Sequence, residues 1–281
     1  MKPTMTTLFY GATLFYGASL LGFATLANAE QAASADESRG LTIMQERKAR
    51  DTGWQNSEAS LEMQLTNGQG QTSSRELRMK NLEVAGDGDK SLSIFDTPLD
   101  VKGTAFLSFS HVNSADDQWL YLPALKRVKR ISSRNKSGPF MGSEFAYEDL
   151  SSFEVPKYRY RYLKDEDLAG QKTWVIENIP NDEYSGYSKL VSWIDQQEYR
   201  VLKTQYYDRK SALLKTLVFS DYQAYQVDTP TGESKTFWRA NKMVVDNHQT
   251  GKSTQLIFKE YRFNTGLTDA DFNQSKLKRA R

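Results

Sequence analysis

The amino-acid sequence predicts an α+β protein that is mainly β, with one large curved antiparallel sheet and a few helices over its concave face. Three observations lead to this fold class. Segments in which apolar and polar residues alternate recur roughly a dozen times after residue 60. Almost no segment of helical periodicity lies between them, so parallel crossovers have no connecting helices. Tyr and Phe, which favour sheets, number 15 and 14, and only seven prolines interrupt the chain.

The N-terminus has the composition of a secretory signal peptide, which we predict over residues 1–29. Lys2 supplies a positive charge, an apolar stretch covers residues 8–26, and small residues end at Ala29, where a signal peptidase would cleave. The alternative is a membrane anchor, but glycines interrupt the stretch and no cluster of charges follows it. We expect cleavage after Ala29, a periplasmic location and a single domain over residues 30–281.

There is no cysteine among the 281 residues. An exported protein without thiols has no disulfide framework and no thiolate metal ligands, so its core must hold it together. The acyl anchor of a lipoprotein is also excluded, because Glu30 follows the predicted cleavage site. The formal net charge of +2 gives no overall field toward nucleic acid or anionic lipid. Because the export signal also separates the chain from nucleic acid, we expect no nucleic-acid partner.

One helix is predicted near the start of the mature chain, over residues 36–50. Ser34 stands three residues before Glu37, which is the spacing of a capping box. Leu41 and Met44 then lie on one helical face. This apolar stripe is wide enough to pack on a sheet.

The strands begin with a predicted hairpin, whose strands at 61–65 and 76–79 are joined through a turn at 67–68. Another strand follows at 92–95. Further strands are predicted at 104–112, 118–122, 127–131, 157–163, 172–179, 188–195, 199–207, 213–226, 235–246 and 253–263. So little helix cannot fill the concavity of so large a sheet, and an apolar space between sheet and helices is where a ligand would lie.

Motifs for nucleotide, metal or nucleophile chemistry are weak. Residues 250–254 imitate the end of a P-loop, but Asp246 replaces the required glycine and two strands flank the run, which predicts a hairpin turn. His111 and His248 lack the spacing of a metal site. Glu144 with a second carboxylate could serve a glycan hydrolase, which is the minority hypothesis. We expect no enzymatic activity, no metal and no cofactor.

The segment 119–150 is the most unusual part of the chain, because glycines and a proline prevent regular structure around several apolar side chains. Apolar side chains in a loop either plug a core or contact a partner. Two compatible hypotheses follow: a loop folded over the open end of the sheet, and a mobile gate to an apolar cavity. The candidate cavity or gate residues are Trp119, Tyr121, Pro139, Phe140, Met141 and Phe145.

A concentrated basic run lies inside the same segment. It could be a charged strand edge that prevents aggregation between sheets. It could instead dock onto an acidic partner or onto lipid headgroups. The candidate docking residues are Lys126, Arg127, Lys129 and Arg130.

At these residues the sequence resembles a known family. The runs DQWLYLP (117–123), RVKRI (127–131), GPFMGSEF (138–145) and YEDL (147–150) are similar to those of outer-membrane lipoprotein-sorting proteins, periplasmic relatives of the lipoprotein carrier LolA. The resemblance extends over the mature chain. It implies a half-open antiparallel barrel covered by helices, a hydrophobic cavity for acyl chains and no enzymatic activity.

The resemblance also implies a function. It points to a periplasmic carrier that binds the acyl chains of lipoproteins or other lipids and transfers them toward the outer membrane. An inner-membrane exporter of the resistance-nodulation-division (RND) type and an outer-membrane acceptor are candidate partners. The alternative is a lipid sensor or an accessory module of such an exporter, which transports nothing. The resemblance does not assign the carrier's functional arginine to Arg75 or to Arg78.

Overall fold

Thirteen β-strands make up most of the protein in its computed structural model, which describes residue 1 and residues 20–279. The first six are β1 (Asn56–Thr66), β2 (Thr72–Leu82), β3 (Lys90–Thr97), β4 (Ala105–Phe109), β5 (Asp117–Leu122) and β6 (Arg127–Ile131). The others are β7 (Tyr158–Leu168), β8 (Gln171–Pro180), β9 (Tyr187–Asp195), β10 (Val201–Asp208), β11 (Leu213–Asp228), β12 (Ser234–Asn247) and β13 (Ser253–Phe263). Every strand predicted from the alternating pattern is present; β6 and β13 have the predicted ends, and the other strands have shifted ends.

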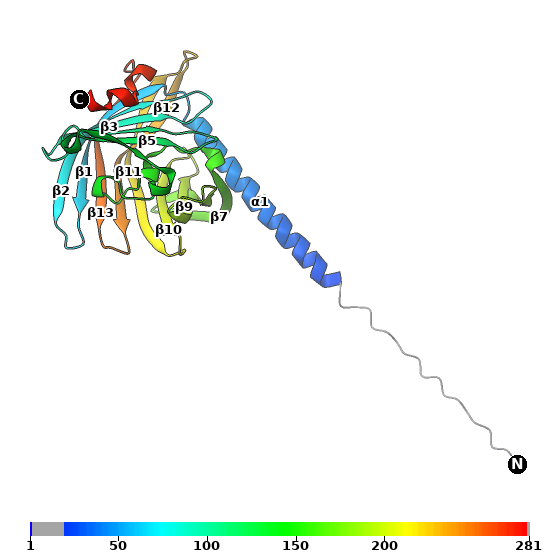
Figure 1. Ribbon diagram of the computed structural model, residues 1–281. Coiled ribbons are helices and arrows are strands. Elements are labelled where there is room, and N and C mark those ends of the chain that lie inside the picture. Colours follow the sequence, from blue (N-terminus) through cyan, green and yellow to red (C-terminus); the bar gives the residue numbers. More distant parts are fainter. Residues whose placement is uncertain (2–19, 280–281) are drawn as a thin grey trace.

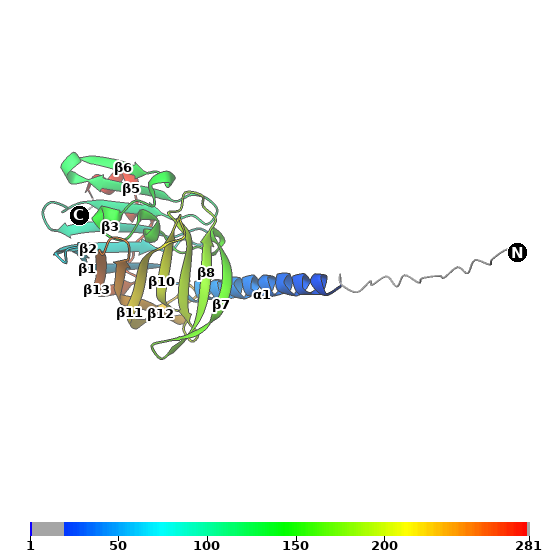
Figure 2. The same cartoon turned by 90° about the horizontal axis from the view of Figure 1, so that it is seen from below.

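The strands form one antiparallel sheet that bends around a hollow without closing (Figures 1 and 2). Strands adjacent in sequence pair with each other, except that β6 and β7 do not pair, and β1 pairs with β13. The order β6-β5-β4-β3-β2-β1-β13-β12-β11-β10-β9-β8-β7 therefore leaves β6 and β7 as the free edges. An open, bent sheet of this kind is a half-barrel, so the predicted fold class is confirmed.

The registers agree with the turn chemistry in the sequence. In the first hairpin Leu61 lies opposite Leu77, and both side chains are buried. The β12–β13 hairpin turns at residues 248–252, where the amide of Gly251 donates to the carbonyl of Asn247 over 2.9 Å. The P-loop-like run is therefore a hairpin turn, as predicted.

One α-helix, α1 (Leu20–Arg50), packs on the concave side of the sheet against β7. Gly40 allows the close approach, since a Cβ there would lie 2.8 Å from the backbone nitrogen of Tyr162. Ile43 and Met44 are buried in a cluster with Ile176, so the predicted packing of this helix on the sheet is confirmed. No helix within the described residues has both the length and the apolar character needed to cross a membrane.

The helix begins earlier than predicted, so Ser34 and Glu37 lie inside it and do not form a capping box at its start. The preceding residues 20–35 contain many alanines and no proline, so nothing in their sequence interrupts a helix. Most of the predicted signal peptide, residues 2–19, lies outside the described residues. The signal peptide and its cleavage after Ala29 stay predictions.

The sheet is covered on both faces in its N-terminal half. On the outer face, Phe272 and Leu277 of the C-terminal segment pack onto Ile94 of β3 and Leu107 of β4, and this segment lies across the sheet in Figure 1. On the concave face, a separate buried cluster joins several strands to the segment between β6 and β7. That concave cluster positions the candidate site.

Candidate functional site

Residues 138–150, which we call the lid, lie between β6 and β7 and cover part of the concave face. The lid contains two short 3-10 helices, η3 (Phe140–Gly142) and η4 (Tyr147–Leu150). The amide of Phe140 donates to the carbonyl of Phe145 over 2.7 Å and closes a tight loop. Met141 and Gly142 have φ angles of 50° and 77°, and a glycine meets the second at little steric cost.

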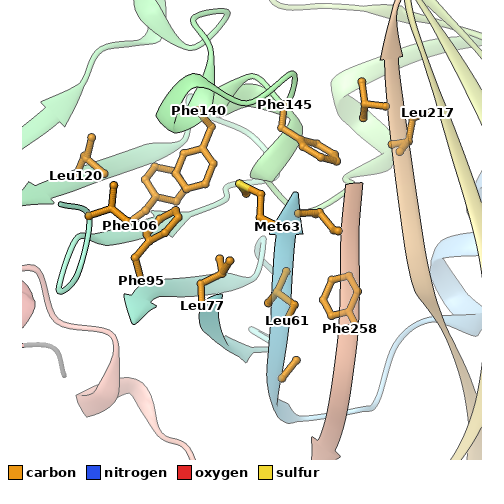
Figure 3. Close-up of a cluster of buried hydrophobic side chains, with 14 of the residues drawn as sticks. Leu61, Met63, Leu77, Phe95, Phe106, Leu120, Phe140, Phe145, Leu217 and Phe258 are labelled. Carbon is orange, nitrogen blue, oxygen red and sulfur yellow. The ribbon is translucent and has the colours of Figure 1, made fainter. Parts of the chain in front are cut away.

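Two aromatic side chains of the lid point into the concave cluster (Figure 3). Phe140 is 1% exposed, and its ring centroid lies 5.2 Å from that of Phe106 and 5.8 Å from that of Phe95. Phe145 is 4% exposed and belongs to the same cluster as Met63 and Leu217. The lid is therefore a plug whose aromatic rings are buried against β-strands from both halves of the sheet.

A buried ion pair holds the C-terminal half of the lid. Lys215 Nζ of β11 lies 2.6 Å from Asp149 Oδ2, and the two side chains are only 4% and 5% exposed. The same ammonium donates to the carbonyl of Glu144 over 2.8 Å, and Tyr187 Oη donates to Asp149 Oδ1 over 2.8 Å. These contacts satisfy both charges at a site with little exposure to solvent, which makes the pair costly to break.

Side chains of β2 and β12 also hold the lid. Arg75 of β2 donates from Nη1 to the carbonyl of Met141 over 2.5 Å. Asn247 Nδ2 donates to Glu144 Oε2 over 2.6 Å. Arg78, by contrast, forms an ion pair with Asp96 at 2.8 Å, and the strand period of two turns its side chain to the opposite face of the sheet from Arg75. Of these two arginines, Arg75 is the one that contacts the lid.

Beneath the lid lies a hollow with an apolar part and a polar part. The apolar cavity has a volume of about 560 Å³, and the polar cavity has one of about 700 Å³. Asp149, Tyr206 and Phe219 line both cavities, so the two adjoin each other. The side chains that make the first cavity apolar include Leu61, Met63, Leu77, Leu217, Leu256 and Phe258. Those that make the second cavity polar include Ser132, Lys136, Glu148, Ser151, Asn178 and Ser192.

The predicted cavity and gate residues divide into two groups. Phe140 and Phe145 line the apolar cavity, and Met141 packs against the cluster around them. Pro139 is exposed and lines neither cavity. Trp119 and Tyr121 require a correction, because they lie in the outer cluster covered by the C-terminal segment.

The physical reason for that correction is the strand period of two. Gln118 and Leu120 of β5 face the hollow, where Gln118 lines the polar cavity and Leu120 joins the concave cluster. Their neighbours Trp119 and Tyr121 must then point to the other face. The aromatic character of these two side chains was therefore no guide to which face of the sheet encloses the cavity.

The predicted docking residues lie at a free edge of the sheet. Arg127, Lys129 and Arg130 belong to edge strand β6, and Lys126 precedes it; all four are exposed. Arg130 forms an ion pair with Asp117 of the adjacent strand. Both interpretations of the basic run, a protected edge and a docking surface, are compatible with this position.

One carboxyl group at the apolar cavity is strongly perturbed. Burial raises the pKa of Asp89 from 3.8 to about 6, although Lys48 opposes the shift. Lys48 itself pairs with the buried Glu154 at 3.0 Å. Because the folded state binds this proton more tightly than the unfolded state, stability should fall as the pH rises from about 4 to about 6.

We therefore expect Asp89→Asn to raise the free energy of unfolding at pH 7.5 by about 1–3 kcal/mol. The gain should disappear below about pH 4, where the carboxyl is protonated in both states. Urea unfolding at several pH values measures this dependence. A gain that is the same at pH 3.5 and pH 7.5 would show that the carboxyl's ionisation is not the cause.

Comparison with known proteins agrees with this geometry. A profile of a family of uncharacterized proteins matches residues 87–279. An outer membrane lipoprotein-sorting protein domain from Vibrio parahaemolyticus is 61% identical, covers 86% of this chain and 99% of its own, and superposes with a TM-score of 0.82. The chain belongs to the family of outer membrane lipoprotein-sorting proteins. Among curated proteins, none is a match.

Two further structures extend the family relationship. A DUF1329 family protein from Desulfovibrio piger is 29% identical with a TM-score of 0.78, and the match covers 86% of this chain and 99% of the other. A LolA superfamily protein from Nitrosomonas europaea is 16% identical with a TM-score of 0.63, over 83% and 97% of the two chains. The last likeness shows that this family has the LolA fold.

Proposed function

We propose that the protein is a periplasmic carrier, which holds the acyl chains of lipoproteins or other lipids in the apolar cavity and transfers them toward the outer membrane. The observation that supports this proposal is a cavity of about 560 Å³ below the lid, whose lining contains a group of aliphatic and aromatic side chains together with charged ones such as Lys48, Asp51 and Arg200. A cavity of this size and lining suits a hydrocarbon ligand. Family membership supports the same cargo class.

The architecture also suits reversible binding. Burying each methylene group contributes roughly 0.8 kcal/mol, so a completely enclosed long chain would be released very slowly. Here the sheet is open between β6 and β7, and a loop, the lid, covers part of the hollow. Acyl chains could then exchange without an input of energy.

The hydrogen bond between Arg75 and the lid is expected to control that exchange. Arg75→Met removes the donor to the carbonyl of Met141. A hydrogen bond from a charged donor contributes about 1.5–3 kcal/mol, and partial exposure of Arg75 places it at the low end, so the release of a fluorescent fatty acid should accelerate roughly tenfold. Stopped-flow transfer of the fatty acid from the protein to vesicles measures this rate. Arg78→Met, which changes a neighbouring arginine paired with Asp96, is the matched control and should leave the rate unchanged.

The basic edge is the proposed docking surface. Lys126, Arg127, Lys129 and Arg130 would face acidic lipid headgroups, and the exposed Leu125 beside them would contact the lipid surface. Reversing Arg127 and Lys129 to Glu should weaken salt-sensitive binding to anionic vesicles by roughly tenfold, since each basic residue near such a surface contributes about 1 kcal/mol. Reversing the exposed Arg159 and Lys172 of β7 and β8 provides the control. Equal losses in both pairs would assign the effect to net charge, and an RND-type exporter or an outer-membrane acceptor would become the candidate at this edge.

Two rival functions are separable from transport. A lipid sensor or exporter accessory would use the same cavity without moving cargo, and a glycan hydrolase would use Glu144. The carboxylate of Glu144 accepts the hydrogen bond from Asn247 and ties the lid to β12, which is a structural use of that side chain. The test of the carrier is depletion of the protein followed by membrane fractionation. Cargo should accumulate in the inner membrane, whereas an unchanged distribution would favour the sensor.

A further inference from the structure

Arg47 stands where the polar and the apolar cavities meet. It lies on α1, three residues after the buried Met44, and this spacing directs it toward the sheet. Its side chain lines both cavities. The guanidinium packs on the ring of Phe153, with 4.3 Å between Cζ and the ring centroid.

The positive charge of Arg47 has no acidic side chain in contact with it among the described residues. Among the described residues, no hydrogen bond or ion pair reaches its guanidinium. The adjacent Glu46 pairs with Arg50 at 2.7 Å, and Asp51, which follows the last residue of α1, forms an ion pair with Arg239 at 2.7 Å. Burial accordingly lowers the pKa of Arg47, with Asp51 opposing that shift from a distance. A partly buried cation without an ionic partner is costly, and an anionic ligand would remove that cost.

The other cations around the hollow already have partners. Lys48 pairs with Glu154, and Arg200 pairs with Asp195 at 2.7 Å. Lys136 and Lys157 at the polar cavity pair with Asp182 and Asp116. Lys235 donates to the carbonyls of Ala49 and Thr52 over 3.0 and 2.8 Å. Of the described cations that line the hollow, Arg47 is thus the one whose charged group has neither a hydrogen bond nor an ion pair.

We propose that the cargo is an amphiphile with an anionic headgroup. The anion contacts Arg47, the rest of the headgroup lies in the polar cavity, and the acyl chain occupies the apolar cavity. This assignment rests on the proposed function, and it adds the headgroup class and the orientation of the lipid. A charged hydrogen bond of this kind should favour the anionic lipid roughly tenfold or more over a neutral one with the same chain.

Two lipids with the same acyl chain test the proposal. Lauroyl lysophosphatidate and monolauroylglycerol are titrated separately, below their aggregation thresholds, into the purified protein, and their affinities are compared by calorimetry. Wild-type protein should prefer the phosphate lipid at least roughly tenfold. Arg47→Met should bind both lipids alike, whereas Arg47→Lys should keep most of the preference. Arg159→Gln, at an exposed arginine of β7, should behave like wild type.

Each contrary outcome has a distinct meaning. Equal affinity of wild-type protein for the two lipids, or a preference that survives in Arg47→Met, would overturn the headgroup assignment and leave the carrier proposal standing. Binding of neither lipid would overturn both proposals. Inorganic phosphate is titrated alone as well. If it binds as tightly as the lysophosphatidate, Arg47 serves a free anion rather than a lipid headgroup.

Discussion

Lys215→Met is expected to lower the free energy of unfolding by about 3–5 kcal/mol, because removing one partner of a buried ion pair leaves the other charge unpaired. Lys215 and Asp149 are each at least 95% buried, and both lie between the lid and the sheet. The variant also removes the hydrogen bond to the carbonyl of Glu144. Urea unfolding followed by circular dichroism at pH 7.5 measures the change.

The double variant Lys215→Met with Asp149→Leu distinguishes the cost of leaving one charge unpaired from the loss of the ion pair itself. It removes both charges, so part of the lost stability should return. Lys210→Met, at an exposed lysine in the β10–β11 turn, is the control and should change the free energy of unfolding by less than about 0.5 kcal/mol. A loss below about 1 kcal/mol in Lys215→Met would mean that this pair does not hold the lid.

Ser57→Trp should abolish most acyl-chain binding. Ser57 lies on β1, is 3% exposed and lines the apolar cavity. An indole at this position would occupy space proposed for the chain, and losing the burial of only two or three methylene groups would weaken binding by roughly tenfold to a hundredfold. Displacement of a fluorescent fatty acid measures the affinity.

Ser60→Trp is the matched control on the same strand. Ser60 lies between the buried Ala59 and Leu61, so its side chain points to the opposite face. The control should bind the fatty acid like wild type. Circular dichroism must show both variants folded, and equal affinities in the two folded variants would place the chain somewhere other than this cavity.

The sheet could be predicted from the sequence because a strand with one buried face repeats every two residues. The alternation at the start of β13 is regular, and the predicted bounds 253–263 are those of the strand. The boundary of α1 was less predictable, since the run before Ser34 is compatible with helix and no residue there stops it. Periodicity indicates which elements form, but it does not indicate which face of a sheet surrounds a cavity.

The site was only partly predictable for the same reason. The lid and its Phe140 were identified from apolar residues in a loop. Lys215 was missed, although it shares a strand face with Leu217, and a lysine at a buried register is a detectable signal. Arg47 was missed although its spacing from Met44 places it on the buried side of the helix. The partner of Lys215 comes from a distant part of the chain, so only the folded structure shows that Lys215 has an ionic partner.

The most direct test of the carrier proposal is native mass spectrometry of the protein purified without detergent from its own cells. We predict a population heavier than the chain by the mass of a lipid, which disappears after extraction with organic solvent. Lipid analysis of the extract then identifies the cargo and its headgroup. Repeated recovery of the chain without any bound lipid, also after incubation with long-chain fatty acids, would contradict the proposal that the hollow carries hydrocarbon.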